Sequence, residues 1–249
     1  MTEVAVARTP EPSMEERAAT GLSEFDGMLE GGFLSGSLIT LTGRPGTGKT
    51  IFGSHFLHHG AKKEKQAGMY VSMLESEKSY LHNMRRLGLD FEPLIAQKRF
   101  AFLEIPAPTS EGLPALWEQI AREIEENETE RLVIDSFTAM SPAFQTVGDL
   151  RTFTHVLLGK IVGGASGCTT LLITEEGTGS MGNSPWTGVE EFVADGVIKF
   201  SIVPAGEARV RYIEITKMRG TNHQMGPIPI DIGPRGIRIV HPHVRGNLA

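Results

Sequence analysis

The segment Gly43–Thr50 reads Gly-Arg-Pro-Gly-Thr-Gly-Lys-Thr and has the spacing G-x-x-x-x-G-K-[ST]. An apolar run, Ser37–Thr42, comes directly before it, and a helical pattern, Ile51–Leu57, follows it. The three glycines permit backbone conformations in which consecutive N–H groups converge on phosphate oxygens. The N-terminus of the following helix adds partial positive charge. In this strand, loop and helix context, the pattern predicts a phosphate-binding loop.

Each part of this loop has an expected role in binding a nucleotide. Lys49 is expected to reach the β- and γ-phosphates, and the Thr50 hydroxyl to ligate Mg²⁺. A glycine-rich turn with a stray lysine would leave the flanking strand and helix unexplained. We therefore expect ATP and Mg²⁺ as cofactors, held by Gly43, Arg44, Pro45, Gly46, Thr47, Gly48, Lys49, Thr50 and Ile51.

Composition limits what the rest of the chain can be. With 249 residues and 40% hydrophobic content, the chain can bury one α/β core, which we place at residues 20–249. A net charge of −6 argues against nucleic acid as the main partner. No apolar run approaches the roughly 18 residues of a membrane span. A single cysteine, Cys168, excludes a disulfide within the chain and fits a reducing cytoplasm.

Two regions differ in character from this core. Residues 1–19 contain Pro10 and Pro12 together with Glu11, Glu15 and Glu16, and show little apolar periodicity, so we expect a flexible segment there, outside the core. The final third contains β-like runs separated by proline and glycine, at 197–202, 209–217 and 236–240. Little helix lies between them, which predicts antiparallel strands that extend one edge of a sheet.

Between these regions, β-like runs alternate with helical patterns. The predicted strands are 38–42, 68–73, 99–103, 131–135 and 169–173, and helices are predicted from 49, from 77, over 113–124 and over 150–161. Such alternation predicts an α/β fold with a mostly parallel, twisted sheet flanked by helices.

Asp135 ends a run, Leu132–Asp135, in which it is the only polar residue. In phosphate-loop proteins such a carboxylate holds Mg²⁺ through water beside the loop hydroxyl, here that of Thr50. An aspartate at this position could also cap the next turn. The upstream loop favours the metal role.

Glu75 follows the strand that ends at Met73. A carboxylate at the carboxyl end of a strand near the phosphate loop can orient and deprotonate the water that attacks the γ-phosphate. The alternative is a solvated residue at a helix start, where negative charge is favourable.

Lys217 and Arg219 lie two residues apart at the end of the strand Tyr212–Thr216, so both side chains point to the same side. The turn Gly220–His223 follows them. Two cations beside a flexible turn could reach an anion on a neighbouring subunit, as an arginine finger does. A solvated basic strand end is the alternative.

Several segments, in the expected order, resemble the KaiC-type ATPases of the RecA superfamily. They are Thr20–Phe33, the phosphate loop, Tyr70–Ser72, Val133–Ser136, Gly188–Val197 and Lys217–Thr221. The resemblance runs from about Thr20 to Val240. It implies a RecA-like P-loop NTPase fold that forms hexameric rings, with ATP held between neighbouring subunits.

The resemblance also implies roles for single residues. Lys217 and Arg219 match the basic pair that reaches the γ-phosphate bound by the next protomer, and His223 matches a residue of the same cross-subunit loop. KaiC carries two such domains in tandem and this sequence one, so autokinase activity does not follow. KaiC also has two consecutive glutamates where this chain has Leu74 and Glu75. Glu75 occupies the place of the catalytic glutamate of RecA.

We therefore expect a cytoplasmic, Mg²⁺-dependent ATPase that assembles as a homo-oligomeric ring. Glu75 would position water, and Lys217 with Arg219 would stabilise the transition state. One alternative, favoured by Leu74, is a nucleotide-sensing scaffold with negligible turnover that signals to a protein partner by assembly. Another is a recombination accessory protein that binds single-stranded DNA, against which the acidic composition weighs.

Overall fold

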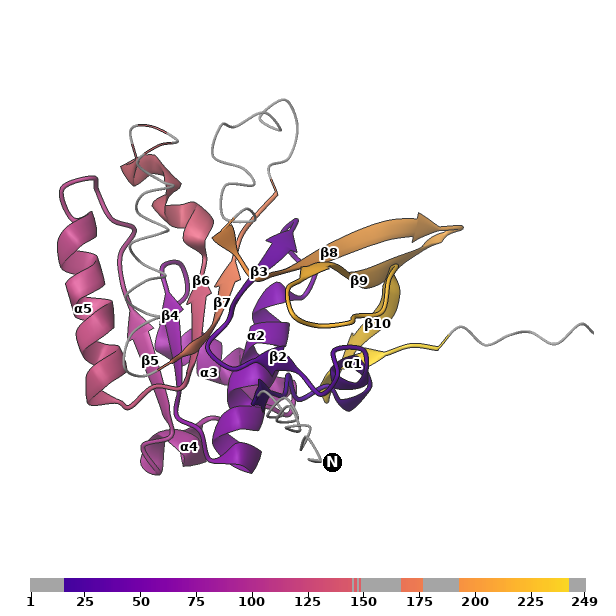
Figure 1. Ribbon diagram of the computed structural model, residues 1–249, viewed down its shortest axis with the longest axis horizontal. Helices are drawn as coiled ribbons and strands as arrows, with labels where there is room; N and C mark the ends of the chain where they lie inside the picture. Colours follow the sequence, from indigo (N-terminus) through magenta and orange to yellow (C-terminus); the bar gives the residue numbers. More distant parts are fainter. Residues whose placement is uncertain (1–15, 145, 147, 149–166, 177–192, 242–249) are drawn as a thin grey trace, which may run out of the picture.

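A nine-stranded β-sheet forms the centre of the structure, a computed structural model that describes residues 16–144, 146, 148, 167–176 and 193–241 (Figure 1). In spatial order the strands are β11 (Gly236–Ile239), β10 (Ile228–Gly233), β9 (Ala208–Met218), β8 (Gly196–Ala205), β3 (Leu38–Gly43), β7 (Thr169–Ile173), β6 (Arg131–Asp135), β4 (Gly68–Ser72) and β5 (Phe100–Glu104). The six strands from β8 to β5 run parallel, whereas β9, β10 and β11 are antiparallel additions at one edge. The expected fold is confirmed, but the run 197–202, predicted as an antiparallel strand, lies in β8 and is wrong in direction, because β8 pairs parallel with β3.

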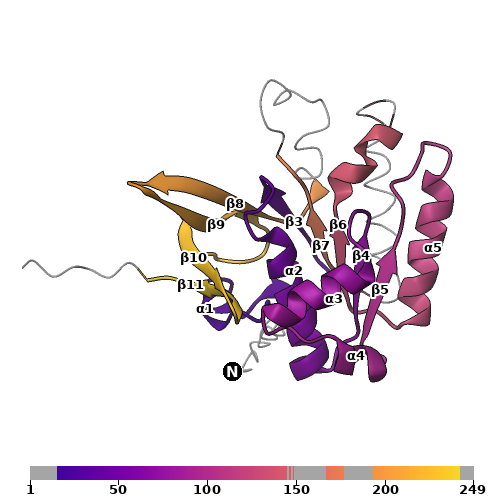
Figure 2. The ribbon, with the colours of Figure 1, turned by 180° about the vertical axis from the view of Figure 1, so that it is seen from behind.

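Helices cover both faces of this sheet (Figures 1 and 2). On one face lie α2 (Lys49–His59), α3 (Glu77–Arg86) and α4 (Glu92–Ala96), whose apolar side chains form one cluster with the strands. On the other face, α5 (Leu113–Glu126) and the 3₁₀ turn Phe137–Ala143 belong to a second cluster. No helix in the described ranges is long and apolar enough to cross a bilayer.

The predicted helices agree with these elements where the chain is described. The helices expected from 49, from 77 and over 113–124 correspond to α2, α3 and α5. The helix expected over 150–161 lies outside the described residues, as does the first half, 188–192, of the segment Gly188–Val197.

Strand β10 is not predicted by the sequence, because Pro227 and Pro229 interrupt its apolar pattern. The Pro229 carbonyl accepts the N–H of Val240 at 2.9 Å, one residue past the end of β11. The N–H and C=O of one strand residue point to the same side, so the missing proline N–H falls at the end of this ladder. Only a terminal hydrogen bond is lost, which explains how the strand tolerates proline.

The N-terminal segment joins the packed structure earlier than we expected. Arg17–Ala18 forms strand β1, which pairs with β2 (Phe33–Leu34), and Ala18 is buried. The segment that we expected outside the core, residues 1–19, therefore extends too far towards the C-terminus, because Arg17 and Ala18 already belong to the packed structure. Residues 1–15 lie outside the described part of the chain.

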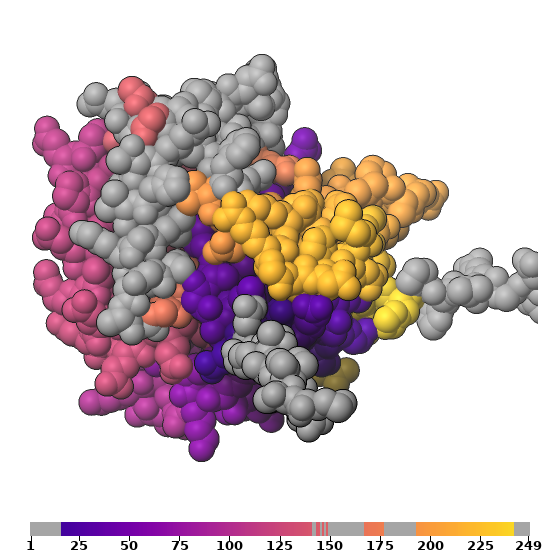
Figure 3. All heavy atoms as spheres, viewed as in Figure 1, coloured from indigo at the N-terminus to yellow at the C-terminus, as the bar shows by residue number. Residues whose placement is uncertain are grey.

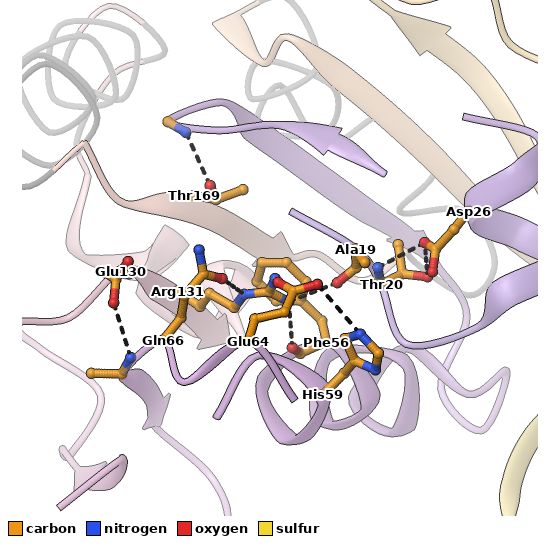
Figure 4. Close-up of polar contacts among 12 residues, drawn as sticks. Ala19, Thr20, Asp26, Phe56, His59, Glu64, Gln66, Glu130, Arg131 and Thr169 are labelled. Atoms are coloured by element: carbon orange, nitrogen blue, oxygen red, sulfur yellow. Dashed lines mark hydrogen bonds and ion pairs between the residues drawn. The ribbon is translucent and has the colours of Figure 1, made fainter. Parts of the chain in front are cut away.

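Arg131, the first residue of β6, is a fully buried cation that ties three distant segments together (Figure 4). Its guanidinium donates to Gln66 Oε1 at 2.6 Å and to the backbone carbonyls of Ala19 and Phe56 at 2.6 and 2.9 Å. It also pairs with Glu64. Burial lowers the pKa of Arg131, while the Glu64 carboxylate favours the charged form. A buried charge with this many partners is costly to disturb.

Gly60 makes room for this arginine. A Cβ at Gly60 would lie 2.3 Å from the Arg131 side chain, although the backbone there is ordinarily helical. Glycine is thus required at position 60 because the Arg131 side chain lies so close to the backbone there. From Gly60 to Glu64 the helix widens into a π-turn, η1, from which Glu64 pairs with the guanidinium. The start of β6 is therefore fixed, and Asp135 lies at its other end.

Candidate functional site

The loop between β3 and α2 has a backbone that only glycine can form at its key positions. Gly43, Gly46 and Gly48 have φ of 145°, 78° and 110°. A Cβ at Gly43 would come within 2.2 Å of the Phe200 carbonyl oxygen, and one at Gly48 within 3.0 Å of Ile232. The loop therefore has the backbone expected of a phosphate-binding loop.

Lys49 is buried at the start of α2, and its ammonium lies against the loop. Nζ donates to the carbonyls of Gly43 at 2.6 Å and Arg44 at 3.0 Å. Burial lowers the pKa of Lys49, whereas the carboxylates of Glu175 and Asp135 favour its charged form. A phosphate in the loop would give this desolvated cation a stronger partner than neutral carbonyls.

Thr50 and Asp135 meet, as the sequence predicts. The Asp135 Oδ2 atom accepts hydrogen bonds from Thr50 Oγ1 at 2.7 Å and from the Tyr70 hydroxyl at 2.5 Å. Tyr70 is fully buried on β4, and burial, reinforced by Asp135, raises its pKa well above the usual range. It therefore remains a protonated donor. The sequence analysis did not identify Tyr70 as a site residue. The feature that could have revealed it is its hydroxyl group on β4, the strand that pairs with β6.

Hydroxyl and carboxylate oxygens are the ligands that Mg²⁺ prefers, so Thr50 and Asp135 suit this ion. Within the described ranges, no group of three or more His, Cys, Asp or Glu side chains could hold a metal. A cation here would therefore need further ligands from phosphate and water, as is usual for Mg²⁺ beside a nucleotide.

Replacing Tyr70 by phenylalanine tests how this carboxylate is positioned. Tyr70→Phe removes one donor to Asp135 without changing the packing shape. We expect the affinity for Mn²⁺ in the presence of a non-hydrolysable ATP analogue, measured by electron paramagnetic resonance, to fall about tenfold, the lower range for such supporting contacts. An unchanged affinity would show that Thr50 alone orients Asp135.

A cavity of about 310 Å³ lies beside the loop. Loop residues line it together with Asp135, Glu175, Arg211 and Ile232. Arg211 on β9 donates from Nε to the Gly46 carbonyl at 3.3 Å. In Figure 3 the yellow C-terminal strands lie against the indigo and purple N-terminal part, which is why residues so distant in sequence line one cavity. No local pattern predicts Arg211, Glu175 or Ile232 here.

Glu75 is not among the described residues that line this cavity. It follows β4, whose last residue, Ser72, is paired with Asp135. Its Oε1 atom accepts hydrogen bonds from Ser79 Oγ and Asn83 Nδ2, both at 2.8 Å. The predicted base is thus at the expected edge of the sheet, with its carboxylate bound to α3.

Arg219 lies near the end of the sheet at which β3 begins, whereas the loop follows the end at which β3 finishes. Its N–H donates to the Asp195 carbonyl at 2.9 Å, and its guanidinium is 3.4 Å from the Asp195 carboxylate. That carboxylate accepts the N–H of Leu38, the first residue of β3. The loop begins at Gly43, where β3 ends, roughly 16 Å further along the strand. Arg219 therefore cannot reach the loop of its own chain.

Lys217 lies beside Arg219, as expected for residues two apart on a strand. Its Nζ donates to the Ala194 carbonyl at 2.6 Å, next to the Asp195 partner of Arg219. His223, in the loop that follows, is partly exposed and has its Nδ1 3.3 Å from the Gln224 carbonyl. The structure thus brings Lys217 and Arg219 together and keeps both apart from Lys49 and Asp135.

His55 connects the loop helix α2 to the C-terminal strands. Its Nε2 accepts the N–H of Ile237 at 2.9 Å, and a Cβ at Gly236 would come within 2.0 Å of this ring. Burial lowers the pKa of His55 to about 4, and the nearby His58 and His59 add to the effect. The ring therefore accepts this hydrogen bond in its neutral form.

Stability should consequently depend on pH through His55. The unfolded chain protonates this histidine near pH 6.5 and the folded chain near 4, so the unfolded state binds more protons in between. We expect the free energy of unfolding in urea to fall by about 3 kcal/mol as the pH drops from 6.5 to 4. His55→Gln should flatten this slope, whereas the exposed control His82→Gln should keep it. Equal slopes in both variants would exclude His55 as the cause.

Comparison with known proteins agrees with this geometry. The sequence profile of the family described as "ATPase: KaiC" matches residues 18–244. The "Circadian clock oscillator protein KaiC" of Parasynechococcus marenigrum (strain WH8102) is 33% identical over 231 residues, 90% of this chain and 44% of that protein. The protein of the same name from Synechococcus elongatus (strain ATCC 33912 / PCC 7942 / FACHB-805) is 32% identical over 228 residues, 88% of this chain and 43% of that protein.

The chain therefore spans less than half the length of these curated relatives. A solved structure is similar over its whole length. The crystal structure of a KaiC-like protein from Pyrococcus horikoshii OT3 covers 91% of this chain and 100% of that chain, with a TM-score of 0.80 and 31% sequence identity.

Proposed function

Because the chain belongs to the KaiC-type ATPase family, we propose that it binds ATP with Mg²⁺ and hydrolyses it at the interfaces of a homo-oligomeric ring. The observation that carries this proposal is the separation of two sets of residues. The phosphate loop, Thr50 and Asp135 lie at the carboxyl ends of the parallel strands, whereas Lys217 and Arg219 lie near their amino ends. In a ring, Lys217 and Arg219 of one copy would face the phosphate loop of the next copy. Each site would then contain residues of two neighbouring copies.

Within this proposal each side chain has a chemical role. A water oxygen attacks the γ-phosphorus, the bond to the β–γ bridging oxygen breaks, and ADP and phosphate leave. Glu75 accepts a proton from that water, and Lys49 balances charge on the β- and γ-phosphates. Lys217 and Arg219 of a neighbouring copy stabilise charge on the transferred phosphoryl group.

Mg²⁺, when bound, would neutralise charge on the phosphates, with Thr50 and, through water, Asp135 as its protein ligands. We place His223 on the same cross-subunit loop as Arg219. Six copies and a cytoplasmic location complete the proposal, as the family resemblance suggests.

Turnover and assembly test the proposal together. We expect the purified protein to form a larger species when ATP and Mg²⁺ are added, measured by size-exclusion chromatography with light scattering. Glu75→Gln keeps the shape of the side chain but removes the base, so it should assemble normally and lose a factor of about 10²–10⁴ in turnover.

Two results would contradict parts of this assignment. ATP-driven assembly with no hydrolysis above the Glu75→Gln background would leave a nucleotide-sensing scaffold. Parental turnover in Glu75→Gln would remove Glu75 as the base, and Glu175, which lines the cavity, would be tested next.

A further inference from the structure

The backbone of Glu75 is clamped to the end of β4. Its N–H donates to Ser72 Oγ at 2.9 Å, and the same hydroxyl donates to the Glu75 carbonyl at 2.7 Å. Ser72 is itself buried within the sheet. Since both backbone groups of Glu75 are held by one buried hydroxyl, the carboxylate can change place only by rotation about side-chain bonds.

The Glu75 carboxylate is held by two donors on one face of α3. Ser79 and Asn83 lie four and eight residues after Glu75, so their side chains follow each other along the helix. Both donate to Oε1 at 2.8 Å, and the Asn83 amide also approaches Ser79 Oγ at 3.4 Å. One carboxylate oxygen thus receives two hydrogen bonds from this helix.

These donors belong to a helix that the core holds in place. Tyr80, next to Ser79, is fully buried, with its ring centroid 4.5 Å from that of Tyr70. Its hydroxyl is 2.8 Å from Ser54 Oγ on α2. Because α3 is anchored in this way, it is the carboxylate that must move if the contact breaks.

Bound to α3, Glu75 is not among the described residues that line the phosphate-loop cavity. We propose that Ser79 and Asn83 form a latch that keeps Glu75 turned away from the nucleotide and so limits the rate of ATP hydrolysis. The latch rests on the proposed role of Glu75 as the base. Side-chain rotation is fast compared with turnover, so the latch acts by lowering the population in which the base faces the water.

The neighbouring residue makes this latch more consequential. Leu74 stands beside Glu75, is 73% exposed and carries no proton acceptor in its side chain. Glu75 is the only carboxylate between the end of β4 and the start of α3 apart from Glu77, which already belongs to the helix. When Glu75 is bound to α3, the loop between β4 and α3 therefore presents no other carboxylate to the attacking water.

Removing the donors should release the base. In the full-length protein assembled with ATP and Mg²⁺, we expect Asn83→Ala and Ser79→Ala each to raise kcat, and the double variant to raise it about five- to tenfold. KM for ATP should stay unchanged, because neither residue lines the cavity. His82→Ala, a change at an exposed position on the same helix, is the matched control and should keep the parental kcat.

The Glu75→Gln background separates the latch from other effects of these variants. If the latch acts through the carboxylate, the double variant should change nothing once Glu75 is replaced. A lower or unchanged kcat in the double variant, while Glu75→Gln alone is inactive, would overturn the latch and leave the proposed base intact. Parental turnover in Glu75→Gln would overturn both. Melting temperatures within the range of the His82→Ala control would show that the variants are folded.

Discussion

Arg219→Ala is expected to reduce ATP hydrolysis by a factor on the order of 10³, the lower range for residues that stabilise a transferred phosphoryl group from a neighbouring subunit. The phosphate loop of the same chain should still bind ATP, because Arg219 lies roughly 16 Å from that loop along the direction of β3. Its described side-chain partner is Asp195 at 3.4 Å, an ion pair with both side chains substantially exposed. Such surface pairs contribute little to stability, so the variant should fold.

A matched control and a mixing experiment decide where Arg219 acts. Arg238→Ala removes a comparable exposed pair, with Asp231, and should keep full activity. Arg219→Ala and Glu75→Gln should each be inactive alone, for reasons located in opposite halves of one interface. When the two proteins exchange subunits, some interfaces pair an intact Glu75 with an intact Arg219, and hydrolysis should return. An inactive mixture despite demonstrated exchange would refute the ring mechanism.

The part of the site that local sequence predicts is the part built from contiguous residues. Gly43–Ile51 spans the loop after β3 and the start of α2, and its glycines, lysine and threonine are contiguous in the chain. Asp135 is visible because it is the polar end of an apolar strand. The meeting of Thr50 and Asp135 then follows from the parallel order of the sheet, since the carboxyl ends of parallel strands share an edge.

The remaining features depend on contacts that spacing does not encode. Arg211 contacts the loop because the antiparallel strands are added beside β8 at one edge of the sheet. Strand β10 is not recognisable in the sequence because Pro229 interrupts its apolar pattern. The contact of Tyr70 with Asp135 depends on the neighbouring order of β4 and β6. For Glu75, the sequence predicts its position on the backbone, while Ser79 and Asn83 decide where its carboxylate lies.

The second large effect is expected from Lys49→Ala. The ammonium is buried, lies against the loop carbonyls and is surrounded by carboxylates, so its charge acts where water screens it little. A charged hydrogen bond to phosphate of this kind is worth enough that its loss should weaken ATP binding by roughly a hundredfold. Isothermal titration calorimetry with ATP and Mg²⁺ measures this directly, and ATP-dependent assembly should disappear with it.

Lys199 provides the matched lysine for this experiment. It lies on β8 near the loop, is 46% exposed and pairs with Glu176 at 3.2 Å, but it is not among the described residues that line the cavity. Lys199→Ala should therefore bind ATP with parental affinity. The Lys49→Ala protein should keep its melting temperature without nucleotide, because the loss of the hydrogen bonds to the Gly43 and Arg44 carbonyls is offset by removal of the burial cost of the cation. It should lose the rise in melting temperature that ATP produces in the parent. Parental ATP affinity in Lys49→Ala would mean that nucleotide binds elsewhere on the chain and that the phosphate-loop assignment is wrong.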